Sequence, residues 1–339
     1  MLSHIRSVHF AGICGTAMAS AAAAMQERGF LVTGSDANVY PPMSTFLAER
    51  KVEVTSGYAE PNLAHKPDLV VIGNALSRGN PEVEAVLDRK LRYCSLPELL
   101  KEFFIRGKRS LVVSGTHGKT TTTSLLTWVF ESAGLNPSYL IGGIPSNLGA
   151  GARFTDSEWF IIEGDEYDSA FFDKRSKFIH YAPHIAVLNN LEFDHADIFR
   201  DLADVQRAFF HFTRIVPRNG WIVLNGDDDN LRALGPLAWT RVVRVGVGEG
   251  NDLRIAGFRE SAEGASFRLV WQGRPWAEVK WSQPGIFNAR NAAMAALAAG
   301  LALFPDDPAK LQLDSLARFR GVKRRQELLV STPRLKVIE

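Results

Sequence analysis

The stretch 110–123, which reads Ser-Leu-Val-Val-Ser-Gly-Thr-His-Gly-Lys-Thr-Thr-Thr-Thr, constrains the fold of this chain more than any other. The apolar run 111–113 predicts a buried strand, and the apolar residues in 125–130 are spaced as in a helix. The loop between them ends in Gly118-Lys119-Thr120. Strand, glycine loop and helix in this order indicate a phosphate-binding loop, because backbone N–H groups and the helix N-terminus can face a polyphosphate.

The same stretch predicts the chemistry of the loop. Lys119 is expected to bridge the β and γ phosphates of a bound polyphosphate, and the Thr120 hydroxyl is expected to hold Mg²⁺. The first glycine of the longer loop pattern is replaced by Val113. The match is therefore to a shortened form, and a purely structural turn with an exposed lysine is the alternative. The expected phosphate-binding residues are Gly115, Thr116, His117, Gly118, Lys119, Thr120 and Thr121.

Length and composition limit the classes of protein that fit. A chain of 339 residues with 46% hydrophobic residues is expected to form two domains. A net charge of +2 predicts no nucleic acid partner. Two cysteines, Cys14 and Cys94, predict neither a disulfide framework nor a zinc site, and a cytoplasmic location fits best. The run 10–24 resembles a signal peptide but is too short to span a membrane, so no membrane partner is expected.

Residues 1–107 alternate between strand and helix signals, which predicts a Rossmann-like parallel sheet with helices on both faces. The first turn, 12–18, follows a strand and precedes an alanine-rich helix. Such a turn binds a nucleotide diphosphate in open α/β sheets, and an acid about twenty residues later reaches a ribose hydroxyl. The complete dinucleotide fingerprint is absent, so a dehydrogenase remains an alternative. The candidate nucleotide-binding residues are Gly12, Gly15, Met18, Ser35 and Asp36, with Ser77 and Asn80 beyond the strand 70–72 as further candidates.

Two carboxylate-rich segments follow apolar strands in the second half of the chain. Glu163 ends the strand 159–162, where a nucleotide's Mg²⁺ is expected to find a protein ligand. His195 lies among acids after the strand 185–188 and suits a second cation or a proton transfer. The alternatives are a solvated acidic loop and a structural histidine.

The remaining segments complete an α/β chain. Residues 253–281 alternate as in antiparallel hairpins, an alanine-rich helix reaches Leu303, and a further helix is expected around 311–319. We therefore predict a Rossmann-like domain at 1–107 and a P-loop NTPase-like central domain with a small antiparallel β element at 108–319. The segment 320–339 is expected to begin a linker to a missing C-terminal domain.

Together these motifs resemble the Mur ligase family, over nearly the whole chain. The resemblance rests on the turn 12–18, the phosphate loop 115–121, Glu-Gly-Asp-Glu-Tyr-Asp-Ser at 163–169, Asn-Leu-Glu-Phe-Asp-His at 190–195, the pair Asn288 and Asn291, and Val-Lys-Arg-Arg-Gln-Glu at 322–327.

The resemblance implies an ATP-dependent ligase that forms an amide bond on UDP-N-acetylmuramate through an acyl phosphate. It implies ATP and Mg²⁺ as cofactors and Lys119, Glu163, His195 and Arg325 as catalytic residues. Metal ions would be held by Thr120 and Glu163 and by His195, and Asn288 and Asn291 would serve the nucleotide. Phe287 departs from the histidine that many relatives carry, which leaves an adenine contact there open.

Several alternatives remain at this point. The turn 12–18 and residues 38–44 look most like family members that add a tripeptide, L-Ala-γ-D-Glu-meso-diaminopimelate, in peptidoglycan recycling. Members that add L-alanine are the alternative, as the amine could be a peptide or an amino acid. A kinase or GTPase and a non-catalytic nucleotide-binding module are further alternatives, and the sequence assigns no oligomeric state.

Overall fold

The structure is a computed structural model that describes residues 4–323, 328–331 and 336–338. Its internal contacts divide the chain into two compact units. The first unit comprises Met1–Arg106 and Tyr167–His180, and the second comprises Gly107–Glu166 and Tyr181–Glu339. The chain therefore passes between the units at 106/107, 166/167 and 180/181. The predicted domains placed residues 167–180 in the second domain, whereas the structure places this segment in the first unit.

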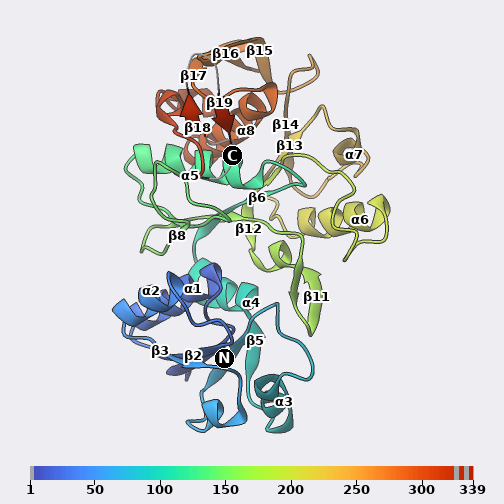
Figure 1. Cartoon of the computed structure of the whole chain (residues 1–339). Helices are drawn as coiled ribbons and strands as arrows, with labels where there is room; N and C mark the ends of the chain where they lie inside the picture. Colours follow the sequence, from blue (N-terminus) through green and yellow to red (C-terminus); the bar gives the residue numbers. More distant parts are fainter. Residues whose placement is uncertain (1–3, 324–327, 332–335, 339) are drawn as a thin grey trace. The chain divides into compact units, whose positions relative to one another are not determined.

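The first unit is built on a five-stranded parallel sheet with the order β3-β2-β1-β4-β5 (Figure 1). Its strands are β1 (Ser7–Ala11), β2 (Leu31–Asp36), β3 (Glu53–Ser56), β4 (Leu69–Ile72) and β5 (Tyr93–Ser95), and its helices are α1 (Thr16–Glu27), α2 (Met43–Glu49), η1 (Glu60–Leu63), α3 (Pro81–Asp88), α4 (Leu96–Leu100) and η2 (Lys101–Ile105).

Local sequence signals start the helices of this unit. Asn80 accepts hydrogen bonds from the backbone N–H groups of Glu82 and Val83, and proline occupies the first position of α3. Ser95 and Glu98 form a reciprocal capping box at α4. These caps satisfy N–H groups that have no partner within the helix, so α3 and α4 begin directly after Asn80 and Ser95.

The segment 167–180 forms the hairpin β10 (Asp168–Ala170) and β11 (Asp173–Ser176), followed by η3 (Lys177–His180). Phe171 and Phe172 pack against the cluster that Val70 and Ile72 form with α3. The Phe172 ring meets the ring of Tyr93 edge to face at 4.8 Å between centroids. This hairpin therefore belongs to the first unit through its apolar contacts.

The second unit contains a ten-stranded mixed sheet with the order β17-β16-β15-β14-β13-β12-β6-β9-β7-β8. Its strands are β6 (Arg109–Ser114), β7 (Ser138–Leu140), β8 (Ala152–Arg153), β9 (Trp159–Glu163), β12 (Pro183–Leu188), β13 (Trp221–Asn225), β14 (Arg241–Gly246), β15 (Leu253–Ser261), β16 (Gly264–Trp271) and β17 (Arg274–Trp281). Its helices are α5 (Lys119–Ser132), α6 (Leu202–Thr213), α7 (Asp229–Arg232), α8 (Ile286–Leu303), η4 (Pro308–Lys310) and η5 (Leu316–Arg318), and β18 (Leu328–Ser331) pairs with β19 (Lys336–Ile338).

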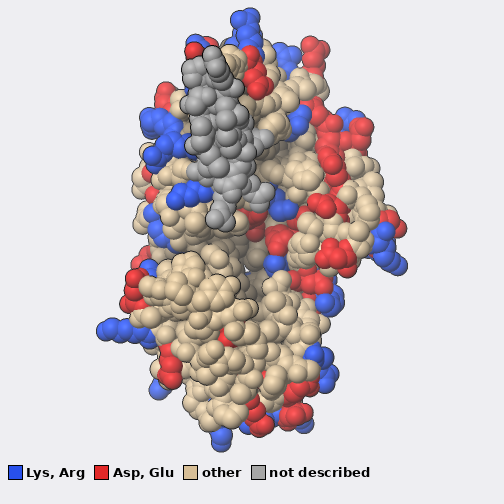
Figure 2. Space-filling model, in the orientation of Figure 1, with Lys and Arg blue, Asp and Glu red and all other residues tan. Residues whose placement is uncertain are grey.

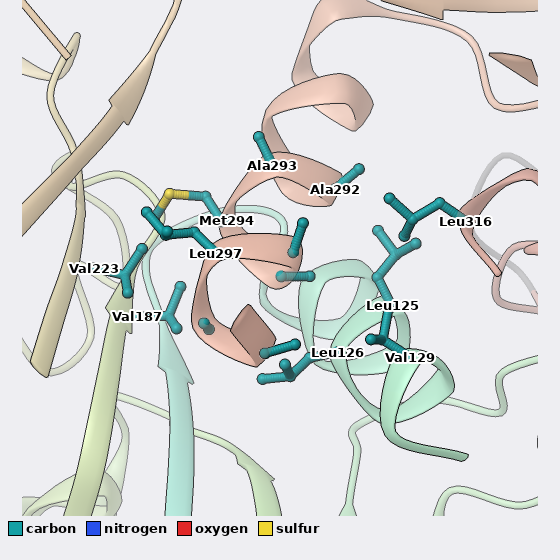
Figure 3. Packing of buried hydrophobic residues seen from close by; sticks show 14 of the residues in the cluster. Leu125, Leu126, Val129, Val187, Val223, Ala292, Ala293, Met294, Leu297 and Leu316 are labelled. Carbon is teal, nitrogen blue, oxygen red and sulfur yellow. The ribbon is translucent and has the colours of Figure 1, made fainter. Parts of the chain in front are cut away.

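The core of this unit lies between the sheet and the pair α5 and α8. Figure 3 shows Leu125 and Leu126 of α5 close to the alanine-rich face of α8, with Val187 of β12 on the sheet side. The small alanine side chains of α8 let the two helices approach closely. Helix α8 is apolar and long enough to cross a membrane, but 78% of it is buried inside the unit.

Acidic side chains gather over the part of the second unit where α6 and α7 lie (Figure 2). Asp204 there pairs with Arg200 and Arg207, and Asp229 pairs with Arg232. These charges are thus balanced locally by basic partners.

The α/β fold class is confirmed, with a parallel sheet in the first unit and antiparallel strands β15, β16 and β17 added to the second. The expected helix around 311–319 is wrong, since only the short 3₁₀ helix η5 forms there. The Leu311 carbonyl accepts from the indole N–H of Trp276, and the Ser315 carbonyl accepts from that of Trp128. These carbonyls are bound by tryptophans at the positions where an α-helix would use them.

Candidate functional site

The phosphate-binding loop connects β6 to α5 as its sequence predicts. Gly115 has a φ of 141° and Gly118 a φ of 78°, which favour glycine. A Cβ on Gly118 would lie 2.6 Å from Oδ1 of Asn291, and a Cβ on Gly115 would lie 2.9 Å from Cβ of Asn189. Both glycines are therefore required by close packing as well as by backbone conformation.

Side chains from the loop after β12 hold this phosphate loop in shape. Asn190 accepts a hydrogen bond from the His117 N–H at 2.7 Å and donates its amide to the His117 carbonyl at 3.1 Å. The Thr116 hydroxyl contacts the backbone N–H and carbonyl of Glu192 at 2.9 and 3.2 Å. Asn190 and Glu192 of the loop 189–195 thus fix the conformation of the phosphate loop at Thr116 and His117.

Lys119 lies at the start of α5 with its ammonium group bent back over the loop. Its Nζ donates to the Gly115 carbonyl at 2.8 Å and to Oε1 of Glu166 at 2.8 Å. The Glu166 side chain is only 3% exposed, and its Oε1 also lies 3.2 Å from Nε2 of His195. Lys119 and His195 therefore share one carboxylate.

A second carboxylate, that of Glu163 at the end of β9, contacts Thr120, the next residue of α5 after Lys119. The Thr120 hydroxyl donates to Oε1 of Glu163 at 3.0 Å, and the Gly142 N–H donates to Oε2 at 2.7 Å. Burial raises the pKa of Glu163 above its ordinary value, while these two hydrogen bonds and the Lys119 charge oppose the shift. The hydroxyl and carboxylate oxygens lie as close together as two ligands of one cation.

Comparison with known proteins identifies the family. Residues 113–299 match the Mur ligase middle domain, and residues 7–108 match the Mur ligase family catalytic domain. The UDP-N-acetylmuramate--L-alanyl-gamma-D-glutamyl-meso-2,6-diaminoheptandioate ligase of Haemophilus influenzae is 45% identical over 96% of this chain and 70% of its own length. The chain belongs to the Mur ligase family. It is accordingly a ligase, as the sequence resemblance implies.

Another Mur ligase is less similar in sequence, and two solved structures have the same fold as this chain. The UDP-N-acetylmuramate--L-alanine ligase of Bordetella avium is 34% identical over 96% of this chain and 68% of its own. The crystal structure of UDP-N-acetylmuramate:L-alanyl-gamma-D-glutamyl-meso-diaminopimelate ligase from Neisseria meningitides superposes with a TM-score of 0.85 and 43% identity, covering 94% of this chain and 99% of that one. A murein peptide ligase from Psychrobacter arcticus gives 0.83 and 38%, covering 98% and 72%.

In this Mur ligase, the first turn is organised by Asp36. Its carboxylate accepts from the backbone N–H groups of Cys14 and Asn38, both at 2.9 Å. Gly12 has a φ of 86° and donates its N–H to the Ser35 carbonyl at 2.8 Å. Gly15 directly precedes α1, so the helix N-terminus opens at this turn.

Other candidate residues of the first unit are used inside the protein. The buried Ser35 hydroxyl donates to Oε2 of Glu82 at 2.5 Å. Asn80 uses its side-chain oxygen to cap α3, and Met18 is buried in α1. The Ser77 carbonyl accepts from the Asn80 N–H at 3.2 Å in the turn before this helix. The structure thus gives Ser35 and Asn80 roles in the fold.

The remaining predicted residues of the second unit fall into three places. Asn291 accepts from Asn189 at 3.2 Å and lies against the phosphate loop, whereas Asn288 donates to the Pro284 carbonyl at 2.7 Å in its own helix start. Thr121 is half-buried in the first turn of α5. Arg325 lies outside the described residues.

Sequence reasoning assigned no role to Glu166, Asn189 or Asn190. Glu166 follows strand β9, and Asn189 and Asn190 follow strand β12, next to the residues for which a role was expected. Their position after a strand was the available signal, but the sequence alone did not show which side chains there turn toward Lys119 and His117.

The donor set fits a nucleotide with a divalent cation. Backbone N–H groups at a helix N-terminus, a lysine and a hydroxyl with an adjacent carboxylate suit a Mg²⁺-bound polyphosphate. Oε2 of Glu166 is buried and has no hydrogen-bond partner within the described part of the chain. An acceptor atom of this kind calls for a donor or a cation when the site is filled.

Proposed function

We propose that this chain catalyses the ATP-dependent joining of L-Ala-γ-D-Glu-meso-diaminopimelate to UDP-N-acetylmuramate, as in peptidoglycan recycling. The observation that carries the substrate choice is the 45% identity to two ligases named for this tripeptide, against 34% to ligases named for L-alanine. L-alanine is the second candidate amine. The partners are thus the sugar nucleotide and the peptide amine, and the proposed location is the cytoplasm, where both ATP and UDP-sugars occur.

The reaction has two steps in this proposal. A carboxylate oxygen of the lactyl group attacks the γ-phosphorus of ATP, and ADP leaves. The peptide amine then attacks the acyl carbon, inorganic phosphate leaves and the nitrogen loses a proton. Because carboxylate and triphosphate are both anionic, the protein must supply positive charge where they meet.

The chain's residues have distinct tasks in this scheme. Lys119 binds the β and γ phosphate oxygens, and the N–H groups at the start of α5 face the phosphates. Thr120 and Glu163 would hold Mg²⁺, with His195 near a second cation. When bound, the cations neutralise charge on the phosphate and carboxylate oxygens.

The first unit contributes the sugar-nucleotide site in this proposal. Gly12, Gly15 and the start of α1 would face the diphosphate, since the helix N-terminus attracts anions. Asp36 keeps the turn in the required conformation through its bonds to Cys14 and Asn38. Asn291 would act on the nucleotide through its contact with the phosphate loop, and Arg325 is proposed from the family resemblance alone.

Substitution of Lys119 by alanine tests the division of tasks. The variant should lose acyl phosphate formation by at least about a hundredfold, because the phosphate charge loses its positioned counter-charge. Its affinity for UDP-N-acetylmuramate, measured by calorimetry, should stay within about twofold of the wild type. Equal loss of both properties would contradict the proposed separation, and ligation of L-alanine in preference to the tripeptide would favour the second candidate amine.

A further inference from the structure

Glu166 is a buried carboxylate with an uneven set of partners. Its Oε1 accepts from Lys119 at 2.8 Å and lies 3.2 Å from Nε2 of His195, while Oε2 is buried without a hydrogen-bond partner among the described residues. The neighbouring Glu163 differs, since Thr120 and Gly142 bind one oxygen each. An ionised carboxylate can accept about four hydrogen bonds. Glu166 is thus incompletely satisfied at a site built for charged groups.

The contact with Lys119 bears on nucleotide binding. Lys119 follows Gly118 at the start of α5, where a phosphate-loop lysine binds phosphate oxygens. In the structure its ammonium is paired with Glu166 and two loop carbonyls, Gly115 and Thr116. A phosphate therefore competes with the Glu166 carboxylate for the same ammonium group.

The same carboxylate oxygen also lies 3.2 Å from Nε2 of His195. Glu166 therefore joins the phosphate loop to the loop that follows β12. His195 has a φ of 58°, and its N–H donates to Oδ1 of Asp194, so its backbone is held as well.

We propose that Glu166 is a positioning residue that holds Lys119 over the phosphate loop until the phosphates of ATP replace it. This proposal rests on the proposed ATP-dependent function and adds a residue that the function does not assign.

Glu166→Gln tests the competition for Lys119 because it keeps the shape of the side chain and removes its charge. Calorimetry with ATP in the presence of EDTA excludes divalent cations from the comparison. The variant should bind ATP about tenfold more tightly than the wild type, since the phosphates no longer displace a carboxylate. Glu158→Gln, an exposed change just before β9, is the matched control and should leave the affinity unchanged.

A second variant keeps the charge of the side chain and changes its length. Glu166→Asp keeps the charge and serves as the second variant if Glu166→Gln does not fold, with ATP affinity at the wild-type level as its expected result.

The outcomes separate the two proposals. Failure of the wild type to bind ATP would refute the proposed function itself. Wild-type binding together with equal or weaker binding by Glu166→Gln would overturn the exchange at Lys119.

Discussion

At the scale of single residues, Asn190 shows how a side chain outside the phosphate loop determines the shape of that loop. Its two hydrogen bonds to the His117 backbone fix the peptide that precedes Gly118. A loop held in one conformation before ligand binding loses less entropy when the ligand arrives.

Asn190→Ala should therefore weaken ATP binding about tenfold and lower the free energy of unfolding by about 2 kcal/mol, from two lost hydrogen bonds. Calorimetry and urea unfolding measure the two quantities. Asn251→Ala removes a comparable amide, bonded to Asp227 and Gly248, and should change stability without changing ATP affinity. A wild-type affinity for ATP in Asn190→Ala would show that the two hydrogen bonds to the His117 backbone are not needed for nucleotide binding.

The local parts of this site could be predicted from sequence, and the long-range parts could not. Neighbouring residues determine the order of strand, glycine loop and helix around Gly118 and Lys119. This part of the site can therefore be predicted from the sequence. The pairing of Lys119 with Glu166 joins positions 47 apart in the chain. Nothing in the acidic run 163–168 distinguishes Glu163, which meets Thr120, from Glu166, which meets Lys119, before the strands are placed side by side.

At the scale of elements, the segment 167–180 carries its own network of charges. The Asp173 carboxylate accepts two bonds from the Arg175 guanidinium and lies 2.8 Å from Nε2 of His180. The Arg175 guanidinium lowers the pKa of Asp173 to about 2 from 3.8. Burial lowers the pKa of His180 below 6.5, although Asp173 opposes that shift. Both groups are thus less protonated in the folded chain than in the unfolded one.

The sign of the pH dependence follows from these shifts. Because the unfolded chain binds more protons, the stability from His180 is present above pH 6.5 and is lost as the pH falls below that value. The contribution of Asp173 is lost later, between pH 3.8 and about 2. His180→Gln has no ring to protonate, so it does not lose this stability at low pH. The variant should be less stable than the wild type at pH 7, and the difference in unfolding free energy should be smaller at pH 5.

Urea unfolding at the two pH values measures this difference. His211→Gln, on the exposed side of α6, should keep a constant difference from the wild type. Asp173→Asn should cost about 1 kcal/mol at pH 7 after solvent screening is included. A deficit of His180→Gln that stays the same at pH 5 would show that the buried ring does not control this part of the fold.

The elements also show where sequence patterns reach their limit. Helix α8 and the hairpins β15 to β17 follow from composition and alternation, which act over neighbouring residues. The expected helix at 311–319 does not form, because the indole N–H groups of Trp128 and Trp276 bind carbonyls of this segment. Both tryptophans lie far from the segment in the sequence. The return of 167–180 likewise depends on aromatic partners such as Tyr93 in another part of the sequence.

At the scale of the whole molecule, the chain links its two units by three crossings, and the short segment 167–180 lies between two of them. Its neighbours in sequence, β9 and β12, belong to the sheet of the second unit. Its neighbours in space are β4, β5 and α3 of the first unit. Stability changes in this segment should therefore appear in the first unit.

Phe172→Ala tests that expectation, because it removes the ring that meets Tyr93 and packs on the cluster around Val70. The loss of this partly buried ring should cost about 2 kcal/mol. Hydrogen exchange should therefore rise in peptides from β4 and β5 and stay unchanged in β9 and β12. Phe154→Ala, which loses a ring contact with Phe160 in the second unit, is the control and should raise exchange around β9 instead. Faster exchange in β12 with protected β4 in Phe172→Ala would assign the hairpin to the stability of the second unit.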